Sequence, residues 1–445
     1  MRFNPYNSKS NVKKPIGYRF LAVGIAVNVA TGLALTMPTP AFANSQNQQQ
    51  IQSSHQIINL SKAVTMTLES HPELKALVAK EAVWQGNIEQ AGIGERPQIG
   101  LMIEDALGTG EHSALKSMQS TLTYSWLLQQ DQIDGRINAA KSQASAVQVE
   151  QKIKALDLSA IVAKQFVEIL IKKERLKLNQ LAVSQAQEVV NAIGKRVKAG
   201  KSSNVEMRLA QAELVRRNLA VEDLEHELKA SHYQLSSLWG KPQAELKLTG
   251  NLMLKPEIPS VESQLTKLKQ IPQIQQFANE QRITQSQMEL ARIEAKPQWQ
   301  FTAGLRRYET TDDFGLVAGV SIPWGSENRN AGTIAALRAK QDVLASQQQA
   351  LMQKLDAQLY VLLQEMAHSH HVIETIQLEI IPVLETALTE ASQAFDIGKL
   401  SYNQWSDIRR ELLSAQNQLL AAYQSLHLQH IEIQRLTGVY VSDSE

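Results

Sequence analysis

The 445-residue sequence contains no cysteine, and this absence limits how the chain is held together. A chain without thiols forms no disulfide, so its stability must come from packing or from association with other chains. The sequence also lacks a Walker loop, a nucleophile elbow and a zinc-protease motif. The adjacent acids Glu104 and Asp105 lie at the end of a predicted strand without a partner of known geometry. We therefore predict a protein that is not an enzyme and needs no cofactor.

Metal ligands are equally sparse. His368, His370 and His371 form a cluster, in which His368 and His371 share one face of a predicted helix. Imidazoles suit zinc or copper, but a closed zinc site normally needs four ligands, and no third ligand is evident here. His368 and His371 are therefore weak metal candidates, and we favour a solvated or interfacial cluster. His427 and His430 have the same spacing, and His430 falls on an apolar seam where packing explains it.

Beyond its N-terminal segment the sequence has no run of 18 or more apolar residues, so it offers no membrane-spanning helix. Residues 1–43 have the features of a secretory signal peptide, with five basic residues, an apolar stretch and the small-residue site Ala41-Phe42-Ala43. An uncleaved membrane anchor is the alternative. Removing the five basic residues changes the formal charge from +1 to −4, which gives no electrostatic reason to bind nucleic acid. Residues 44–57, rich in Gln and Ser, are predicted to be flexible.

The remaining sequence contains a long internal repeat. Its landmarks recur almost in register: Pro72 and Pro97 as Pro272 and Pro297, each 200 residues later, and Gly200 and Gly240 as Gly398 and Gly438, each 198 residues later. A repeat of this length is not a solenoid unit and indicates one duplicated structural half. We predict a first repeat over 58–240, a proline-containing linker over 241–260, a second repeat over 261–438 and a tail over 439–445.

Each half should begin with a helix, over about 58–95 and 261–296, ended by Pro97 and Pro297. Strand pairs follow over 97–128 and 297–323, where apolar and polar residues alternate so that each strand has one face of each kind. About ten residues per strand suits a tilted membrane strand with aromatic anchors near its ends. Hairpins covering a soluble core are the alternative. Because roughly eight strands are needed to close a filled barrel, several chains must contribute.

Two long helices should follow each strand pair. Heptad spacing predicts a coiled-coil helix over 138–194, whose 57 residues would span roughly 85 Å. Its apolar seam comprises Val149, Ile153, Leu156, Ala160, Ala163, Val167 and Leu170. Gly200 and Gly398 suit the turns at the far ends, and Pro382 should kink or interrupt the outgoing helix of the second half. The predicted fold is mainly α, with four strands and two long antiparallel helical hairpins per chain.

This duplicated plan resembles the TolC-type outer-membrane efflux proteins over residues 60–438. The segments Val320-Ser321-Ile322-Pro323-Trp324 and 328–335 are similar to a strand-to-helix junction of the CzcC-like heavy-metal branch, and Asp134-Gly135-Arg136-Ile137 is similar to the corresponding junction of the first half. The resemblance implies a homotrimer in the outer membrane, with one barrel of 12 strands in lipid and a helical tunnel in the periplasm. It also implies a periplasmic adaptor and an inner-membrane pump, of the RND type, as partners.

The resemblance further implies acidic side chains that narrow the periplasmic end, six and nine residues after the tip glycine. These positions hold Gln404 and Asp407 after Gly398, and Glu206 occupies the first of them after Gly200. The alternative for Asp407 is a solvated ion pair with Arg410. The tips at Gly200 and Gly398 are the expected adaptor-docking sites. The resulting hypothesis is a passive efflux channel, with heavy-metal cations as the favoured cargo, and the rival is a periplasmic coiled-coil adaptor or scaffold.

Overall fold

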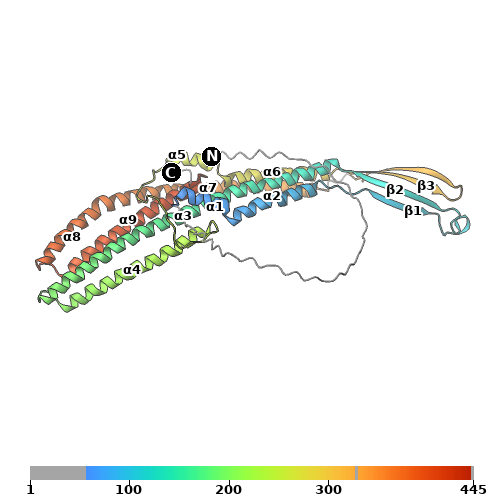
Figure 1. The fold of residues 1–445 in the computed structure, drawn as a ribbon. Helices are drawn as coiled ribbons and strands as arrows, with labels where there is room; N and C mark the ends of the chain where they lie inside the picture. The colour runs from blue at the N-terminus through green and yellow to red at the C-terminus, as the bar shows by residue number, and fades with distance from the viewer. Residues whose placement is uncertain (1–56, 326–328, 442–445) are drawn as a thin grey trace, which may run out of the picture. The chain divides into compact units, whose positions relative to one another are not determined.

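The computed structural model describes residues 57–325 and 329–441 (Figure 1). The predicted signal peptide, nearly all of the flexible segment 44–57 and the last residues of the tail, 442–445, lie outside the described residues. In the described part of the chain, no helix combines the length and the apolar character needed to cross a membrane.

The same order of elements occurs twice. The first half contains α1 (Leu60–Ser70), α2 (Pro72–Ala91), β1 (Gln98–Glu104), the short 3-10 helix η1 (Gly110–His112), β2 (Gln119–Leu128), α3 (Gln130–Lys198) and α4 (Asn204–Ser237). The second half contains α5 (Val261–Leu268), α6 (Pro272–Glu294), β3 (Trp299–Tyr308), β4 (Asp313–Ser321), α7 (Ala331–Thr375), the π-helical segment η2 (Ile376–Ile380), α8 (Ile381–Asp396) and α9 (Tyr402–Leu436). The predicted fold class, an internally duplicated helical chain with four strands, is confirmed.

The first helix of each half was predicted as one element, and this prediction is wrong. His71 has extended backbone angles, φ −61° and ψ 128°, and its Nδ1 accepts a hydrogen bond from the Glu73 N–H at 3.3 Å. Pro72 then occupies the first turn of α2, where its missing N–H costs nothing. Ile271 and Pro272 repeat the arrangement before α6. The residue before a proline disfavours helical angles, so each predicted helix divides there.

The long helices differ from prediction in length and agree in where they are interrupted. Helix α3 has 69 residues rather than the predicted 57, and spans about 100 Å at 1.5 Å per residue. In the second half, Pro382 lies in the first turn of α8, directly after the π-helical segment η2. The proline ring clashes with the backbone carbonyl of the residue four positions earlier, and proline has no N–H to donate to that carbonyl. This explains why regular α-helix stops at Thr375. The predicted interruption at Pro382 is confirmed.

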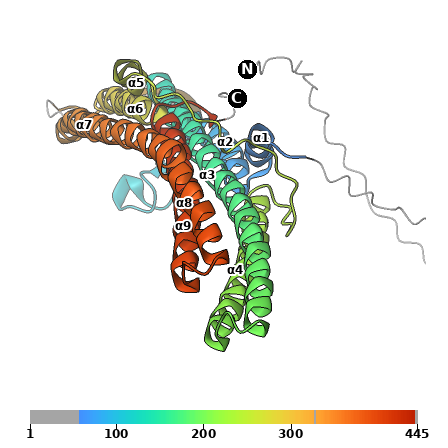
Figure 2. The same cartoon turned by 90° about the vertical axis from the view of Figure 1, so that its left-hand side faces the viewer.

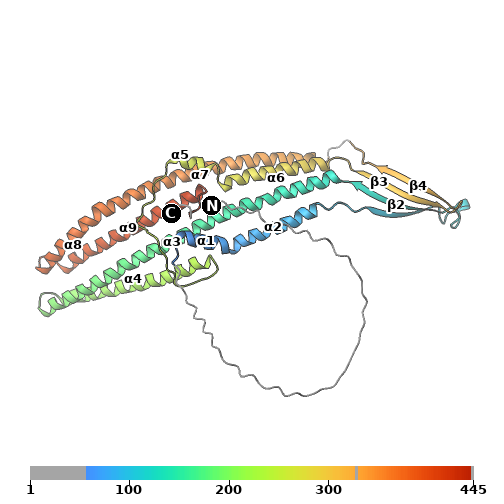
Figure 3. The same ribbon diagram turned by 45° about the horizontal axis from the view of Figure 1, so that its top comes forward.

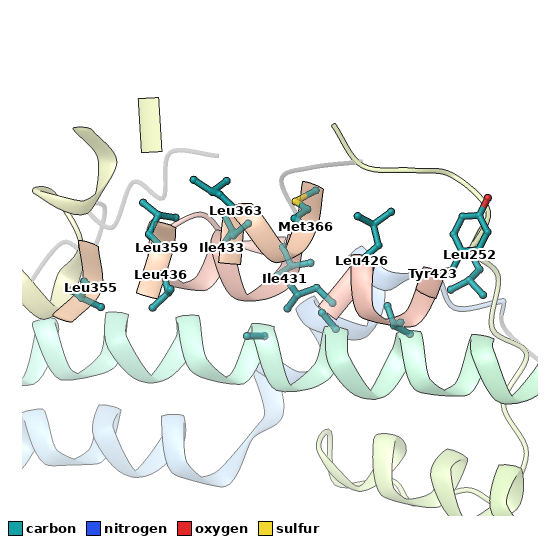
Figure 4. Close-up of a cluster of buried hydrophobic side chains, with 14 of the residues drawn as sticks. Leu252, Leu355, Leu359, Leu363, Met366, Tyr423, Leu426, Ile431, Ile433 and Leu436 are labelled. Carbon is teal, nitrogen blue, oxygen red and sulfur yellow. The ribbon is translucent and has the colours of Figure 1, made fainter. Parts of the chain in front are cut away.

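Helix α3 is buried on two sides at its centre. Ala160, Ala163 and Val167, from the predicted seam, pack against leucines and Met366 of α7 and the buried residues of α9 (Figure 4). On the other side, Val162 and Phe166 pack in a separate cluster with α1, α4 and the linker. Only the first of these two seams was predicted from the sequence. Figure 3 shows why both exist, since α3 runs between the α7–α9 helices and the α1 and α4 helices.

Candidate functional sites on the sheet and at the helical tips

The four strands form one antiparallel sheet in the order β1-β2-β3-β4. Strand β2 pairs with β3 through Trp126 and Phe301, which joins the two halves of the chain in one sheet. Strands β1 and β4 each pair on one side only within the described residues. Their outer backbone groups are therefore open for pairing with a further strand.

One face of this sheet is apolar and exposed. Leu101, Leu122, Leu305 and Leu316 stand in one row across all four strands. Their exposed fractions are 68%, 54%, 46% and 91%, so no part of the described chain covers this face. Aromatic rings gather where the sheet meets the helices: Trp126 stacks on Phe301 at 5.7 Å, with Tyr124 and Trp299 beside them. The alternation predicted from the sequence is confirmed.

The opposite face is polar and contains a cluster that the sequence analysis missed. Arg306 of β3 donates to Thr121 Oγ1 at 2.8 Å, to Gln119 Oε1 at 3.1 Å and to Glu104 Oε2 at 2.8 Å. Glu104 is thus the partner of an arginine rather than half of an acid pair with Asp105. An arginine on the polar face of a strand was the available signal, but its partners lie about two hundred positions away and were not evident without the register.

At the far end of α3, two hairpin tips are built alike (Figure 2). Gly200 has φ +72°, and the Lys201 N–H donates to the Arg196 carbonyl at 2.8 Å; Gly398 has φ +78°, and the Lys399 N–H donates to the Ala394 carbonyl at 2.8 Å. This is the hydrogen-bond pattern that closes a helix after a glycine in the left-handed region. The prediction that these two glycines make the turns is confirmed.

Capping boxes open the returning helices at both tips. Ser203 and Glu206 exchange hydrogen bonds at the start of α4, and Ser401 and Gln404 do so at the start of α9. The Glu206 carboxylate accepts from the Ser203 N–H at 3.1 Å, and the Gln404 amide oxygen accepts from the Ser401 N–H at 3.1 Å. Two of the three residues predicted at the periplasmic constriction therefore have a structural task in their own hairpin.

Asp407, the third predicted constriction residue, lies one turn further along α9. It forms an ion pair with Arg410, and the side chains are 62% and 55% exposed. The structure thus contains the solvated pair that the sequence allowed as the alternative. An exposed pair of this kind contributes little to stability. Because the Asp407 side chain is exposed, its carboxylate is accessible to cations or neighbouring chains.

A stack of cations and aromatic rings joins the two hairpins. The Arg196 guanidinium lies 4.6 Å from the centre of the Phe395 ring, Phe395 stacks on Trp405 at 4.7 Å, and Arg409 lies 5.2 Å from the Trp405 ring. Arg196 also donates to the carbonyl oxygens of Phe395 at 3.0 Å and Asp396 at 3.2 Å. Because Arg196 belongs to α3 and the others to α8 and α9, the stack holds one hairpin against the other. In the sequence, the aromatic residues themselves were the only signal for this stack.

Among the described residues, no group of three His, Cys, Asp or Glu side chains is placed so that it could hold a metal ion. His368 and His371 are exposed on α7, and His370 Nδ1 lies 3.8 Å from Glu374. His427 Nε2 donates to the Leu252 carbonyl at 2.8 Å, and burial lowers its pKa. Burial likewise lowers the pKa of His430, which is half-buried as the sequence predicted.

The chain is similar to known efflux proteins. A family model described as "Outer membrane efflux protein" matches residues 63–241. The cobalt-zinc-cadmium resistance protein CzcC of Cupriavidus metallidurans is 24% identical over 415 residues, which cover 92% of this chain and 98% of CzcC.

Solved structures share the fold. CusC superposes with a TM-score of 0.68 at 16% identity, covering 85% of this chain and 92% of CusC. The outer membrane protein VceC of Vibrio cholerae superposes with a TM-score of 0.67 at 15% identity, covering 85% of this chain and 96% of VceC. With the duplicated plan, the two-faced sheet and the twin hairpins, these likenesses show that the chain has the fold of the outer membrane efflux channels, and that its residues 63–241 match the model of the outer membrane efflux protein family.

Proposed function

We propose that this protein is the outer-membrane channel of a tripartite efflux system, and that it conducts its cargo passively. The observation that carries the proposal is the sheet: one face is apolar and uncovered, and the other is lined by polar side chains such as Thr121, Thr123 and Thr302. In lipid, such a sheet would turn its apolar face outward and its polar face toward a water-filled lumen.

The active assembly would be a homotrimer. Four strands are too few to enclose a lumen, and both outer strands have an open edge. Three chains would join these edges and close one barrel of 12 strands in the membrane lipid. Their long hairpins would form the tunnel in the periplasm, with the tips at Gly200 and Gly398 meeting a periplasmic adaptor and, beyond it, an RND-type inner-membrane pump. In this arrangement no catalytic step and no cofactor is required of the channel.

Heavy-metal cations are the proposed cargo. The support is the similarity to CzcC over nearly the full length of both chains, since that relative is a cobalt-zinc-cadmium resistance protein. Selectivity would reside in the pump, because the polar side chains of the sheet include no cluster of soft metal ligands among the described residues. Asp407, with Gln404 and Glu206 close to the same level, would narrow the periplasmic end of the tunnel.

The rival hypothesis of a periplasmic adaptor or scaffold receives no support from these observations. An adaptor would carry one helical hairpin, whereas this chain has the hairpins α3–α4 and α8–α9 and a four-stranded sheet.

Two experiments test the proposal. In the native host, deleting the gene should lower tolerance to cobalt, zinc or cadmium, and the plasmid-borne protein should restore it. Unaltered metal tolerance would contradict the proposed cargo but would not contradict the channel hypothesis. Membrane fractionation tests the channel itself, since the protein should appear in the outer membrane as a heat-modifiable oligomer. Recovery as a soluble periplasmic monomer would overturn it.

A further inference from the structure

A cavity of about 80 Å³ lies between the two helical hairpins, close to their tips. Helices α3, α4, α8 and α9 all contribute to its wall. About half of the wall is apolar, formed by side chains such as Leu181, Ala186, Val189, Leu388, Leu412 and Leu413, and the rest is polar. By the same measure a cavity needs roughly 10–15 Å³ to hold one water molecule, so this one has room for several.

Two residues of α9 that line this cavity, Trp405 and Arg409, carry hydrogen-bond donors without an anionic acceptor. Trp405 is 9% exposed, and its buried Nε1–H has no hydrogen-bond partner among the residues that the structure describes. Arg409 forms no ion pair with any described residue; its polar contact is the Gln185 amide oxygen at 3.3 Å, and its flat face lies over the Trp405 ring. Burial lowers the pKa of Arg409, as expected for a guanidinium partly removed from water.

The wall carries three arginines, Arg217, Arg409 and Arg410, and one carboxylate, Glu213. Arg217 shares Glu213 with Arg216, and Arg410 pairs with Asp407 outside the wall. The wall is therefore net positive, and Arg409 lies in it without an ion pair to any described residue, although Glu188 and Glu213 are near enough to act on its charge. Because an unsatisfied buried donor and a partly buried cation without an ion pair both cost free energy, this arrangement favours an anion with hydrogen-bond acceptors.

We propose that the cavity is a binding site for a small organic carboxylate, of the size of acetate. One carboxylate oxygen would accept from the Trp405 indole N–H, and the Arg409 guanidinium would pair with the charge. The short alkyl part would contact the leucine and alanine side chains of the wall. This site is separate from the channel function proposed above and does not depend on it. Since its walls come from both hairpins, a bound carboxylate would favour the state in which the hairpins are packed together.

Saturation-transfer NMR on the purified full-length protein in detergent, with sodium acetate as the probe, tests the proposal. The wild-type protein should give a saturable signal, and neutral acetamide of similar shape should give much less. Trp405→Phe keeps the stacking on Phe395 but removes the N–H, and should weaken acetate binding by at least about fivefold. Arg409→Gln should weaken it by at least about tenfold, since it removes the charge.

Arg292→Gln is the matched control, because Arg292 is a half-exposed arginine of α6 that pairs with Glu289 away from the cavity. This control should bind acetate as the wild type does. Equal binding by wild type and Trp405→Phe would overturn the proposal even if Arg409→Gln failed to fold. Absence of saturable binding by the wild type would also overturn it, and would mean that water alone fills the cavity.

Discussion

Glu206 and Gln404 occupy the same position of two repeated capping boxes, six residues after a tip glycine. A capping box needs only a side-chain oxygen that accepts from the backbone, so glutamine serves as well as glutamate. This explains why the second tip departs from the acidic residue that the family resemblance implied. Of the three proposed constriction residues, only Asp407 has a carboxylate that no backbone group uses.

Asp407→Asn is therefore the most direct test of the constriction. If three copies of Asp407 face one another in the assembly, their carboxylates would bind divalent cations and obstruct the current. The substitution should weaken block by divalent cations by roughly an order of magnitude, because amides bind such ions less well than carboxylates. Single-channel recording in planar bilayers measures both the conductance and the block.

The control is Asp396→Asn, which removes an exposed carboxylate at the tip of the same hairpin. Divalent cations should block the current of this variant as strongly as that of the wild type. If Asp407→Asn leaves conductance and block unchanged, Asp407 is only the solvated partner of Arg410.

A second prediction concerns pH and the half-buried histidines of α9. Burial lowers the pKa of His427 and of His430, so the folded protein binds fewer protons than the unfolded chain. The associated stability is fully present above the unfolded imidazole value of about 6.5 and is lost as the pH falls toward the lowered native values. The thermal unfolding temperature should therefore be lower at about pH 5.5 than at about pH 7.5.

His427→Gln should reduce this difference, since the glutamine amide can still donate to the Leu252 carbonyl but does not titrate. His226→Gln provides the comparison, because the His226 side chain is 72% exposed on α4. An equal pH dependence in the wild type and in His427→Gln would show that this histidine does not control the acid limit of stability.

Single residues were only partly predictable from the sequence. The turn glycines and the packed position of His430 followed from local rules, because their neighbours in sequence decide their conformation. Arg306 and Arg409 were missed, since the groups that define their roles come from other elements of the fold. The unpaired state of a buried donor such as Trp405 Nε1 is visible only when all of its surroundings are known.

Elements were predicted best where a period extends over many residues. All four strands lie within the predicted pairs, because strict alternation has one simple explanation. Helix ends were predicted less well: α3 begins eight residues before the expected residue 138, because its first two turns are polar and lack the heptad signal. The second seam of α3 was not predicted for a related reason. When one helix carries two apolar stripes, the spacing of each stripe is difficult to recognise in the sequence.

The hairpin turns offer a test at this scale. Gly200→Ala and Gly398→Ala should each destabilise the tip by roughly 1–2 kcal/mol, because a side chain at a positive φ clashes with the following carbonyl. Neither position has other atoms within 4 Å of an added methyl group, so backbone conformation alone decides the effect. Hydrogen–deuterium exchange should become faster in the segments 197–206 and 395–404.

Gly86→Ala is the matched control, since Gly86 lies inside α2 and also has open space around it. There the substitution should be neutral or stabilise the helix by about 0.5–1 kcal/mol, because alanine is the better helix former. Unchanged exchange at both tips in the glycine variants would mean that the turns readily adopt another conformation.

At the scale of the whole molecule, the described chain leaves a large apolar surface uncovered on its sheet and two strand edges unpaired. These features were foreseen from the sequence, because the strands are too few to close on themselves. The number of chains in the assembly was not, since edge pairing alone does not determine how many copies complete a ring. The homotrimer was implied only by the family resemblance.

The two faces of β4 provide the sharpest test of membrane insertion. Leu316 and Val317 are neighbours in sequence, but Leu316 belongs to the apolar face and Val317 to the polar one. Leu316→Arg should cost about 2–4 kcal/mol if that face lies near the middle of the bilayer, and should reduce the heat-modifiable oligomer in the outer-membrane fraction. Val317→Arg carries the same charge toward the lumen, so oligomer yield should persist while the conductance changes. Equal oligomer yields from both variants would contradict a lipid-facing sheet. Loss of the oligomer in both variants would indicate that both faces of the sheet pack against protein.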